Sequence, residues 1–80
     1  MADMTLQDLY PGQAARVIGL QGGNAGYRQR LLAMGLTPGT RFTITRVAPL
    51  GDPLELHVRG CSLTIRRSEA SIVAVEVLSP

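Results

Sequence analysis

The chain has 80 residues, of which 45% are hydrophobic and 4% aromatic, and a formal net charge of +2. This composition predicts one small globular domain over residues 1–80, which buries about 60 to 65 per cent of the surface of its unfolded chain. The charge is too small to favour nucleic acid as a partner. One cysteine, Cys61, excludes an internal disulfide and fits a reducing compartment, and no apolar run approaches the length of a membrane-spanning helix.

The first third of the chain predicts one helical turn and one strand. Leu6 and Leu9 flank the helical turn, and a Pro-Gly pair at residues 11–12 ends it. Residues 15–20 are mostly aliphatic, which is typical of a strand. The glycine-rich segment that follows lacks the lysine of a phosphate-binding loop, so nucleotide binding is not expected. Its glycines, which we expect to give a flexible approach to the next element, are Gly22, Gly23 and Gly26.

A short helix is predicted from Tyr27 to Met34. Tyr27, Leu31 and Met34 recur at i, i+4 and i+7, so they fall on one helical face. A small domain needs its large apolar residues for the core, so packing is the favoured role of this face and partner binding is the alternative. Arg28 and Arg30 point away from it and are our candidates for contact with a partner, with a solvated helix surface as the equal alternative.

Gly35 and the pair Pro38-Gly39 mark the exit from this helix. A residue just after a helix often takes a left-handed backbone, which glycine adopts without a Cβ clash, so Gly35 is expected to end the helix. Proline fixes φ at the first central position of a type II turn, and glycine tolerates the positive φ of the second. The chain is therefore expected to turn sharply at Pro38 and Gly39 into a new strand.

Residues 40–47 predict a strand with one face in the core. Phe42 and Ile44 alternate with polar residues and are expected to face inward. The alternation slips between Arg46 and Val47, which predicts a bulge or the end of the strand at that point.

A β-hairpin is predicted after a loop at residues 48–53. Its first strand, residues 54–58, alternates apolar and polar side chains, and its second covers residues 63–65. Gly60 and Cys61 are expected to form the turn between them. The side chains of the first strand that we expect to be buried are Leu54, Leu56 and Val58.

The last part of the chain predicts one more helical turn and a final strand. Ser68 is the expected cap of the turn at residues 68–71, and residues 72–78 carry three valines on one side of a strand. Several short strands, one short helix and tight turns favour a mainly β fold, a closed or nearly closed small barrel, because closure removes exposed strand edges.

Four blocks of the chain, in this order, resemble the ferrous iron transport protein A family (FeoA). The blocks are Leu6-x-x-Leu9-x-Pro11-Gly12, the helix and its exit from Arg30 through Met34 to Gly39, the loop Ala48-Pro49-Leu50-Gly51-Asp52-Pro53, and Ile65-Arg66-Arg67-x-Glu69-Ala70. The resemblance implies an SH3-like small barrel of five to six strands, with one short α-helix after the first strand. It also implies a cytoplasmic location and a function in bacterial ferrous iron uptake.

The partner that the resemblance implies is the cytoplasmic GTP-binding domain of a membrane ferrous iron permease, bound from the inner side of the membrane. We expect the contact to involve Tyr27, Arg28, Arg30 and Met34. The chain itself is not expected to span a membrane or to bind nucleic acid, and a monomer or a weak homo-oligomer is expected.

One weak metal site can be placed from the sequence. His57 and Glu55 lie at i and i+2 on the outward face of a predicted strand, where two side chains can share one transition metal ion. A dedicated site usually needs three or four ligands, and the position of Cys61 relative to His57 is not fixed by the sequence. We therefore expect no required cofactor, and at most weak binding of iron or zinc by His57 and Glu55.

Three other functions can be weighed against this hypothesis. An enzyme is not expected, because the single histidine has no evident nucleophile beside it and the carboxylates show no paired arrangement. A freestanding SH3-like regulatory domain related to iron-dependent repressors also fits the barrel pattern. A small RNA-binding barrel is the weaker alternative, because the chain has few aromatic residues for base stacking. Its arginines would be Arg41, Arg46, Arg59, Arg66 and Arg67.

Overall fold

The computed structural model describes residues 4–23 and 25–78. In chain order its elements are β1 (Met4–Thr5), the 3-10 turn η1 (Leu6–Asp8), β2 (Ala14–Leu20), α1 (Ala25–Ala33), β3 (Arg41–Val47), β4 (Leu54–Val58), β5 (Cys61–Ile65), α2 (Arg67–Ala70) and β6 (Val73–Val77). The helical turn at the start, the helix, the hairpin and the final strand were all predicted. Strand β1 was not, because two residues carry no periodicity. Helix α1 consequently follows the second strand rather than the first.

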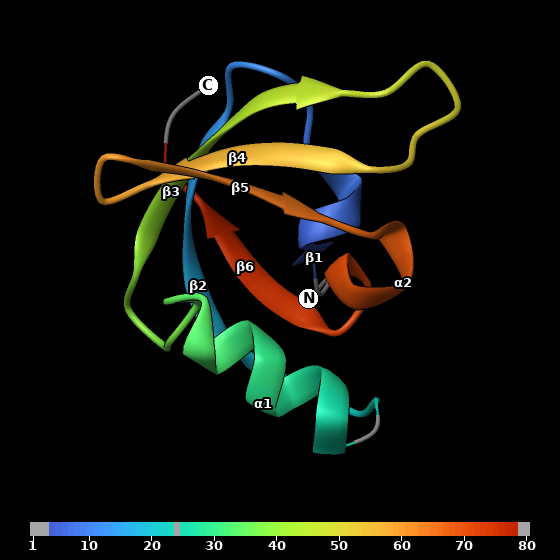
Figure 1. Cartoon of the computed structure of the whole chain (residues 1–80). Coiled ribbons are helices and arrows are strands. Elements are labelled where there is room, and N and C mark those ends of the chain that lie inside the picture. The colour runs from blue at the N-terminus through green and yellow to red at the C-terminus, as the bar shows by residue number, and fades with distance from the viewer. Residues whose placement is uncertain (1–3, 24, 79–80) are drawn as a thin grey trace.

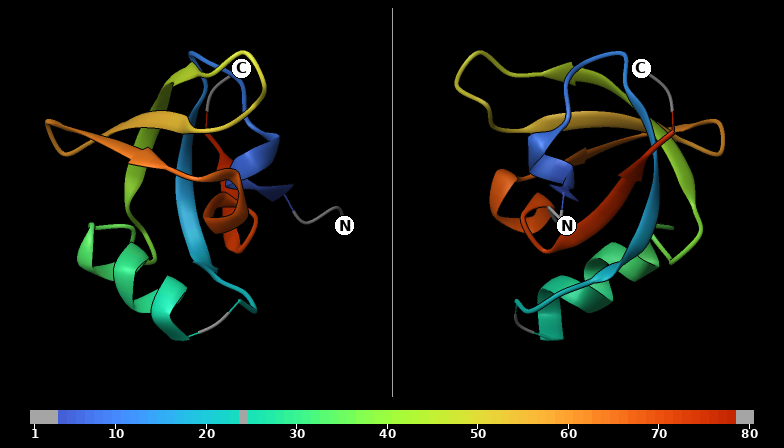
Figure 2. Two further views of the ribbon diagram at one scale, coloured as in Figure 1. Left: turned by 45° about the vertical axis from the view of Figure 1, so that its right-hand side comes forward. Right: turned by 180° about the vertical axis from the view of Figure 1, so that it is seen from behind.

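The six strands form one antiparallel sheet in the order β1-β6-β2-β3-β4-β5. Figure 1 shows the sheet curling round on itself, with η1 and α2 between its two edge strands, β1 and β5. In both views of Figure 2, α1 lies at one end of this barrel and the loop between β3 and β4 lies at the other. The mainly β fold with five to six strands is thus confirmed, with six.

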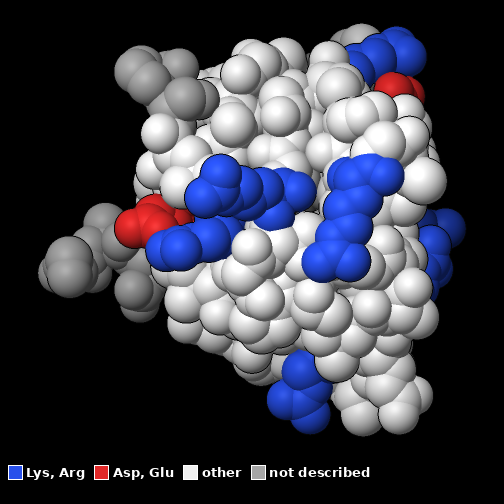
Figure 3. Space-filling model, turned by 90° about the vertical axis from the view of Figure 1, so that its left-hand side faces the viewer, with Lys and Arg blue, Asp and Glu red and all other residues white. Residues whose placement is uncertain are grey.

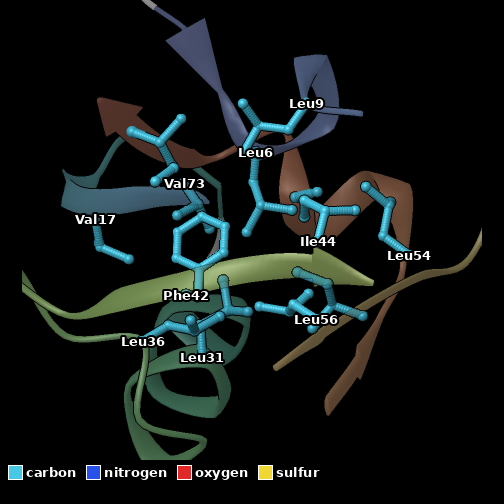
Figure 4. Packing of buried hydrophobic residues seen from close by; sticks show 14 of the residues in the cluster. Leu6, Leu9, Val17, Leu31, Leu36, Phe42, Ile44, Leu54, Leu56 and Val73 are labelled. Atoms are coloured by element: carbon cyan, nitrogen blue, oxygen red, sulfur yellow. The ribbon is translucent and has the colours of Figure 1, made fainter. Parts of the chain in front are cut away.

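The core fills the inside of the curled sheet. Strand residues that alternate toward the interior meet the two leucines of the N-terminal turn, and Leu31 of α1 closes one end. Figure 4 shows Leu31 and Leu36 pointing from the helix and its exit toward Phe42 of β3. The predicted inward residues of the hairpin are all buried, namely Leu54, Leu56 and Val58.

The exit from α1 has the predicted backbone. Gly35 has φ +100°, and Leu36 donates a backbone hydrogen bond to the carbonyl of Leu31 at 3.0 Å, as in a Schellman cap. The type II turn follows, with φ +90° at Gly39. Gly39 then donates to the carbonyl of Val17 at 2.7 Å, so the turn is fastened to β2.

Two local expectations about strands and turns were wrong. The bulge in β3 falls between Ile44 and Arg46, one residue before the predicted slip. The β4–β5 turn has only two residues, Arg59 and Gly60, because Cys61 already pairs with Val58 as the first residue of β5. A two-residue turn with φ +51° and +83° is the type I′ turn that matches the twist of antiparallel strands.

The two remaining corrections concern helix starts. Gly26 lies inside α1 rather than in the approach to it. Ser68 does not cap α2, because Arg66 occupies the cap position and its N–H donates to the Glu69 side chain at 3.1 Å. A glutamate three residues into a helix can satisfy the free N–H before it, which makes a serine cap unnecessary.

Candidate functional site

The outer face of α1 presents one charged and one apolar side chain. Arg28 is exposed and has no ion-pair partner among residues 4–23 and 25–78. Leu32, one helical turn later, has 41% of its surface exposed, although a leucine of this small domain is expected inside. Residues at i and i+4 lie side by side on a helix, so the two form one contiguous patch. The sequence pattern did not single out Leu32, because it lies beside a buried leucine.

Tyr27 and Met34 lie at the edge of this patch and are partly buried. Both pack against the core cluster, as the favoured interpretation of their spacing predicted. Only Leu31, the middle residue of the predicted stripe, is fully buried. The stripe therefore holds α1 on the barrel, and its two outer members also border the exposed surface.

Arg30 is not a free surface charge. Its Nε lies 3.3 Å from Oε2 of Glu69 in α2, and the Glu69 side chain is only 2% exposed. The other carboxylate oxygen accepts the backbone N–H of Arg66. A buried carboxylate needs such partners, because ionised oxygens without them are costly to remove from water. Arg30 thus joins α1 to α2, a role that sequence reasoning missed although Glu69 lies in the fourth family block.

His57 and Glu55 point outward from β4 as predicted, but the structure does not complete a metal site with them. No group of three His, Cys, Asp or Glu side chains lies close enough to hold a metal in the part of the chain that the structure describes. Glu55 lies 3.9 Å from the Arg46 guanidinium, and His57 faces Thr43 and Ser62 on the neighbouring strands. Two side chains are fewer ligands than a dedicated metal site uses.

The arginines named for RNA binding divide between the two ends of the strands. Arg41 begins β3 and Arg59 lies in the β4–β5 turn, where its guanidinium reaches Thr40 Oγ1 at 3.5 Å. Arg46 lies near the other end of β3 and pairs with Glu55, while Arg66 and Arg67 follow β5. The five side chains therefore do not form one continuous groove.

No described helix is long and apolar enough to pass through a bilayer.

Solved structures share this architecture. An FeoA-like protein from Clostridium acetobutylicum is 36% identical with a TM-score of 0.88, and the match covers 100% of this chain and 93% of that one. The FeoA of Stenotrophomonas maltophilia, an SH3 domain protein solved in complex with zinc, is 30% identical with a TM-score of 0.80. That match covers 91% of this chain and 89% of the other. The fold is therefore an SH3-like small barrel.

A sequence relative adds a connection to transport. The Fe(2+) transport protein A/Fe(2+) transporter FeoB fusion protein of Porphyromonas gingivalis is 32% identical over 76 residues, which are 95% of this chain and 9% of the fusion protein. This chain thus spans about a tenth of that protein, within which it matches one segment. Because the FeoA domain profile itself matches residues 4–77, the chain belongs to the FeoA domain family.

Proposed function

We propose that this chain is a non-enzymatic, cytoplasmic accessory protein of bacterial ferrous iron uptake, which acts by binding the GTP-binding domain of a ferrous iron permease. The observation that supports this most is the fusion protein, in which a segment related to this chain and a ferrous iron transporter are parts of one polypeptide. Fusion keeps two modules at a high effective concentration, which favours even a weak contact between them. In separate chains, the same contact must be made by a surface of each protein.

The surface that we assign to this contact is the outer face of α1. Arg28 supplies a charge without an ion-pair partner among the described residues, Leu32 an exposed apolar group, and Tyr27 and Met34 the partly buried border. An apolar centre next to an arginine is the composition that protein interfaces favour. Arg30, which the sequence also nominated, is a positioning residue that fixes α1 against α2 through Glu69.

The experiment compares two matched double variants of the full chain. Arg28→Ala with Leu32→Ala removes the proposed contact, whereas Arg46→Ala with Leu50→Ala makes the same chemical change at the opposite end of the barrel. Leu50 is 93% exposed in the β3–β4 loop and so serves as the apolar control. Both pairs are compared for thermal stability, for co-purification with the permease's GTP-binding domain, and for ferrous iron uptake in cells.

We expect both variants to fold with unchanged thermal midpoints, because exposed substitutions usually change stability by less than about 0.5 kcal/mol. Only the α1 variant should lose co-purification and uptake. Retention of both by a folded α1 variant would reject this face as the contact. Loss in both variants, or no binding by the unmodified chain, would count against direct contact with this domain.

No cofactor is part of this proposal. The S. maltophilia protein was solved with zinc, whereas no group of three metal-binding side chains lies together among the described residues of this chain. We expect His57 and Glu55 to provide at most two ligands. Two ligands at exposed positions hold a first-row metal weakly, so any iron or zinc bound there would not be needed for folding.

A further inference from the structure

Three arginines, Arg16, Arg41 and Arg59, are exposed on the outside of the sheet. In the strand register Arg16 of β2 lies between Glu76 of β6 and Arg41 of β3. Arg59, in the turn after β4, reaches the residue just before Arg41, because its Nη2 lies 3.5 Å from Thr40 Oγ1. All three arginines are exposed, whereas the strand residues next to them in sequence face the core.

Among the described residues, these three arginines have one acidic ion-pair partner between them. Arg16 forms an ion pair with Glu76, and both side chains remain about half exposed. Arg41 lies directly opposite Arg16 and has no ion-pair partner among the described residues. Like charges directly opposite on neighbouring strands destabilise a sheet, so the fold gains nothing from arginine at position 41. Figure 3 shows arginines gathered near the middle of this face, with acidic atoms at only one end of the group.

The position of Arg59 is also locally unfavourable. It is the only described residue other than glycine with a positive φ, at +51°. The first position of a type I′ turn favours asparagine, aspartate or glycine, because larger side chains crowd the backbone there. Its side chain then extends back over the start of β3, where Nη2 lies 3.5 Å from Thr40 Oγ1. Two locally unfavourable choices, at positions 41 and 59, thus place two exposed arginines near the start of β3.

Local rules are most often broken where a residue is kept for function. We propose that Arg41 and Arg59, with Arg16 beside them, form a docking surface for an acidic segment of a partner protein. Guanidinium groups bind carboxylates through a planar pair of donors, so a row of exposed arginines matches a run of glutamate or aspartate side chains. This surface lies on the sheet and is separate from the α1 face of the proposed function.

Carboxylates fit this row better than nucleic acid or a membrane. Binding of single-stranded nucleic acid relies on aromatic side chains for base stacking, whereas the neighbours on this face are Thr43 and His57, and Phe42 of the same strand is buried. Recognition of an anionic membrane typically takes a cluster of about four to eight basic residues, more than this row holds. An acidic protein segment is therefore the occupant that the chemistry favours.

The test uses the full chain and a fluorescently labelled hexaglutamate peptide, with binding followed by anisotropy at low and moderate salt. The binding variant is Arg41→Gln with Arg59→Gln. The control, Arg46→Gln with Arg66→Gln, removes the same net charge at the other end of the strands. We expect the dissociation constant to rise about fivefold in the binding variant and less than twofold in the control. Glu76→Gln, which frees Arg16, should lower it.

The thermal midpoint is a second measurement, and it distinguishes a binding role of Arg41 from a structural one. Because Arg41→Gln removes a like-charge pair, it should leave the thermal midpoint unchanged or raise it by a few degrees, about 2 to 4 °C, while affinity falls. A lowered midpoint would show that Arg41 serves the fold and would overturn the proposal. Equal loss of affinity in both double variants, no binding by the unmodified chain, or tighter binding of hexauridylate RNA through the same arginines would overturn it as well.

Discussion

Helix α1 and the outer face of the sheet both expose arginine, but the two regions use it differently. On α1, Arg30 reaches a carboxylate that is almost fully buried, so the charge is part of the structure that holds the helix to α2. On the sheet, Arg41 faces another arginine and Arg59 occupies a left-handed backbone position. The difference teaches that the exposure of an arginine decides little, whereas the burial of its partner decides whether its loss will be felt by the fold.

The largest expected effect on stability comes from comparing a buried with an exposed leucine of α1. Leu31→Ala should lower the free energy of unfolding by about 2 to 5 kcal/mol, because Leu31 is fully buried and its loss leaves a cavity. Leu32→Ala, its exposed neighbour, should change it by less than about 0.5 kcal/mol. Urea denaturation of both variants measures the contrast. Equal effects would mean that α1 does not pack as described.

The next contrast is between Arg30 and Arg28. Arg30→Ala should cost about 1 to 3 kcal/mol, because it leaves the Glu69 carboxylate buried without its charged partner. Arg28→Ala should be close to neutral. Adding Glu69→Gln to Arg30→Ala should restore part of the loss, since a neutral amide is easier to bury and its oxygen can still accept the Arg66 N–H. A neutral Arg30→Ala variant would show that the ion pair is unimportant in solution.

Gly35 offers a test in which the backbone alone is changed. Gly35→Ala should lower stability by about 1 to 2 kcal/mol, because its φ of +100° strains any residue with a Cβ. No atom outside its chain neighbours lies within 4 Å of the added Cβ, so the cost should come from the backbone and not from a clash. Differential scanning calorimetry measures it, and an unchanged midpoint would contradict the left-handed cap.

In the β4–β5 turn, by contrast, removing a strained residue should raise the stability of the protein. Arg59→Asn should raise stability by about 0.5 to 1 kcal/mol, because Asn-Gly is the preferred sequence of a type I′ turn. The same variant should bind hexaglutamate more weakly. A gain in stability without a loss of binding would separate the strained turn from the proposed docking surface and weaken the link between them.

The smallest expected effect is the binding of zinc by His57 on the outer face of the sheet. Calorimetric titration with zinc should show weak binding that His57→Ala removes, since neutral imidazole is the best first-row ligand on the chain. Stability without zinc should not change, because His57 is exposed. A tight site that survives His57→Ala would show that other residues hold the metal.

Much of the fold could be predicted because local patterns carried it. Alternation in residues 54–58 predicted which side chains are buried, and the Gly35 and Pro38-Gly39 signals predicted the helix exit with its two positive φ values. The error at the start of α2 came from a competing side chain in the same segment. Ser68 was a reasonable cap by residue type, but the Glu69 side chain was already placed to accept the free N–H.

The candidate site was less predictable than the fold. The sequence identified α1 and its arginines, yet it treated Arg28 and Arg30 as equivalent, because nothing in their spacing shows that Glu69 of α2 lies within reach of only one of them. Leu32 was overlooked because a leucine beside a buried leucine has the composition of core.

By itself the sequence determined the helix, its exit and the hairpin, because each depends on residues close together in the chain. It also determined the family, because the four motif blocks can be read in order along the chain without knowing the fold. Only the tertiary structure decided which charges are paired. Arg30 and Glu69 are 39 positions apart, as the difference of their numbers shows, and Arg16 and Arg41 meet only through strand register. Electrostatic interaction depends on distance in space and on burial, and neither is set until the sheet has closed around its core.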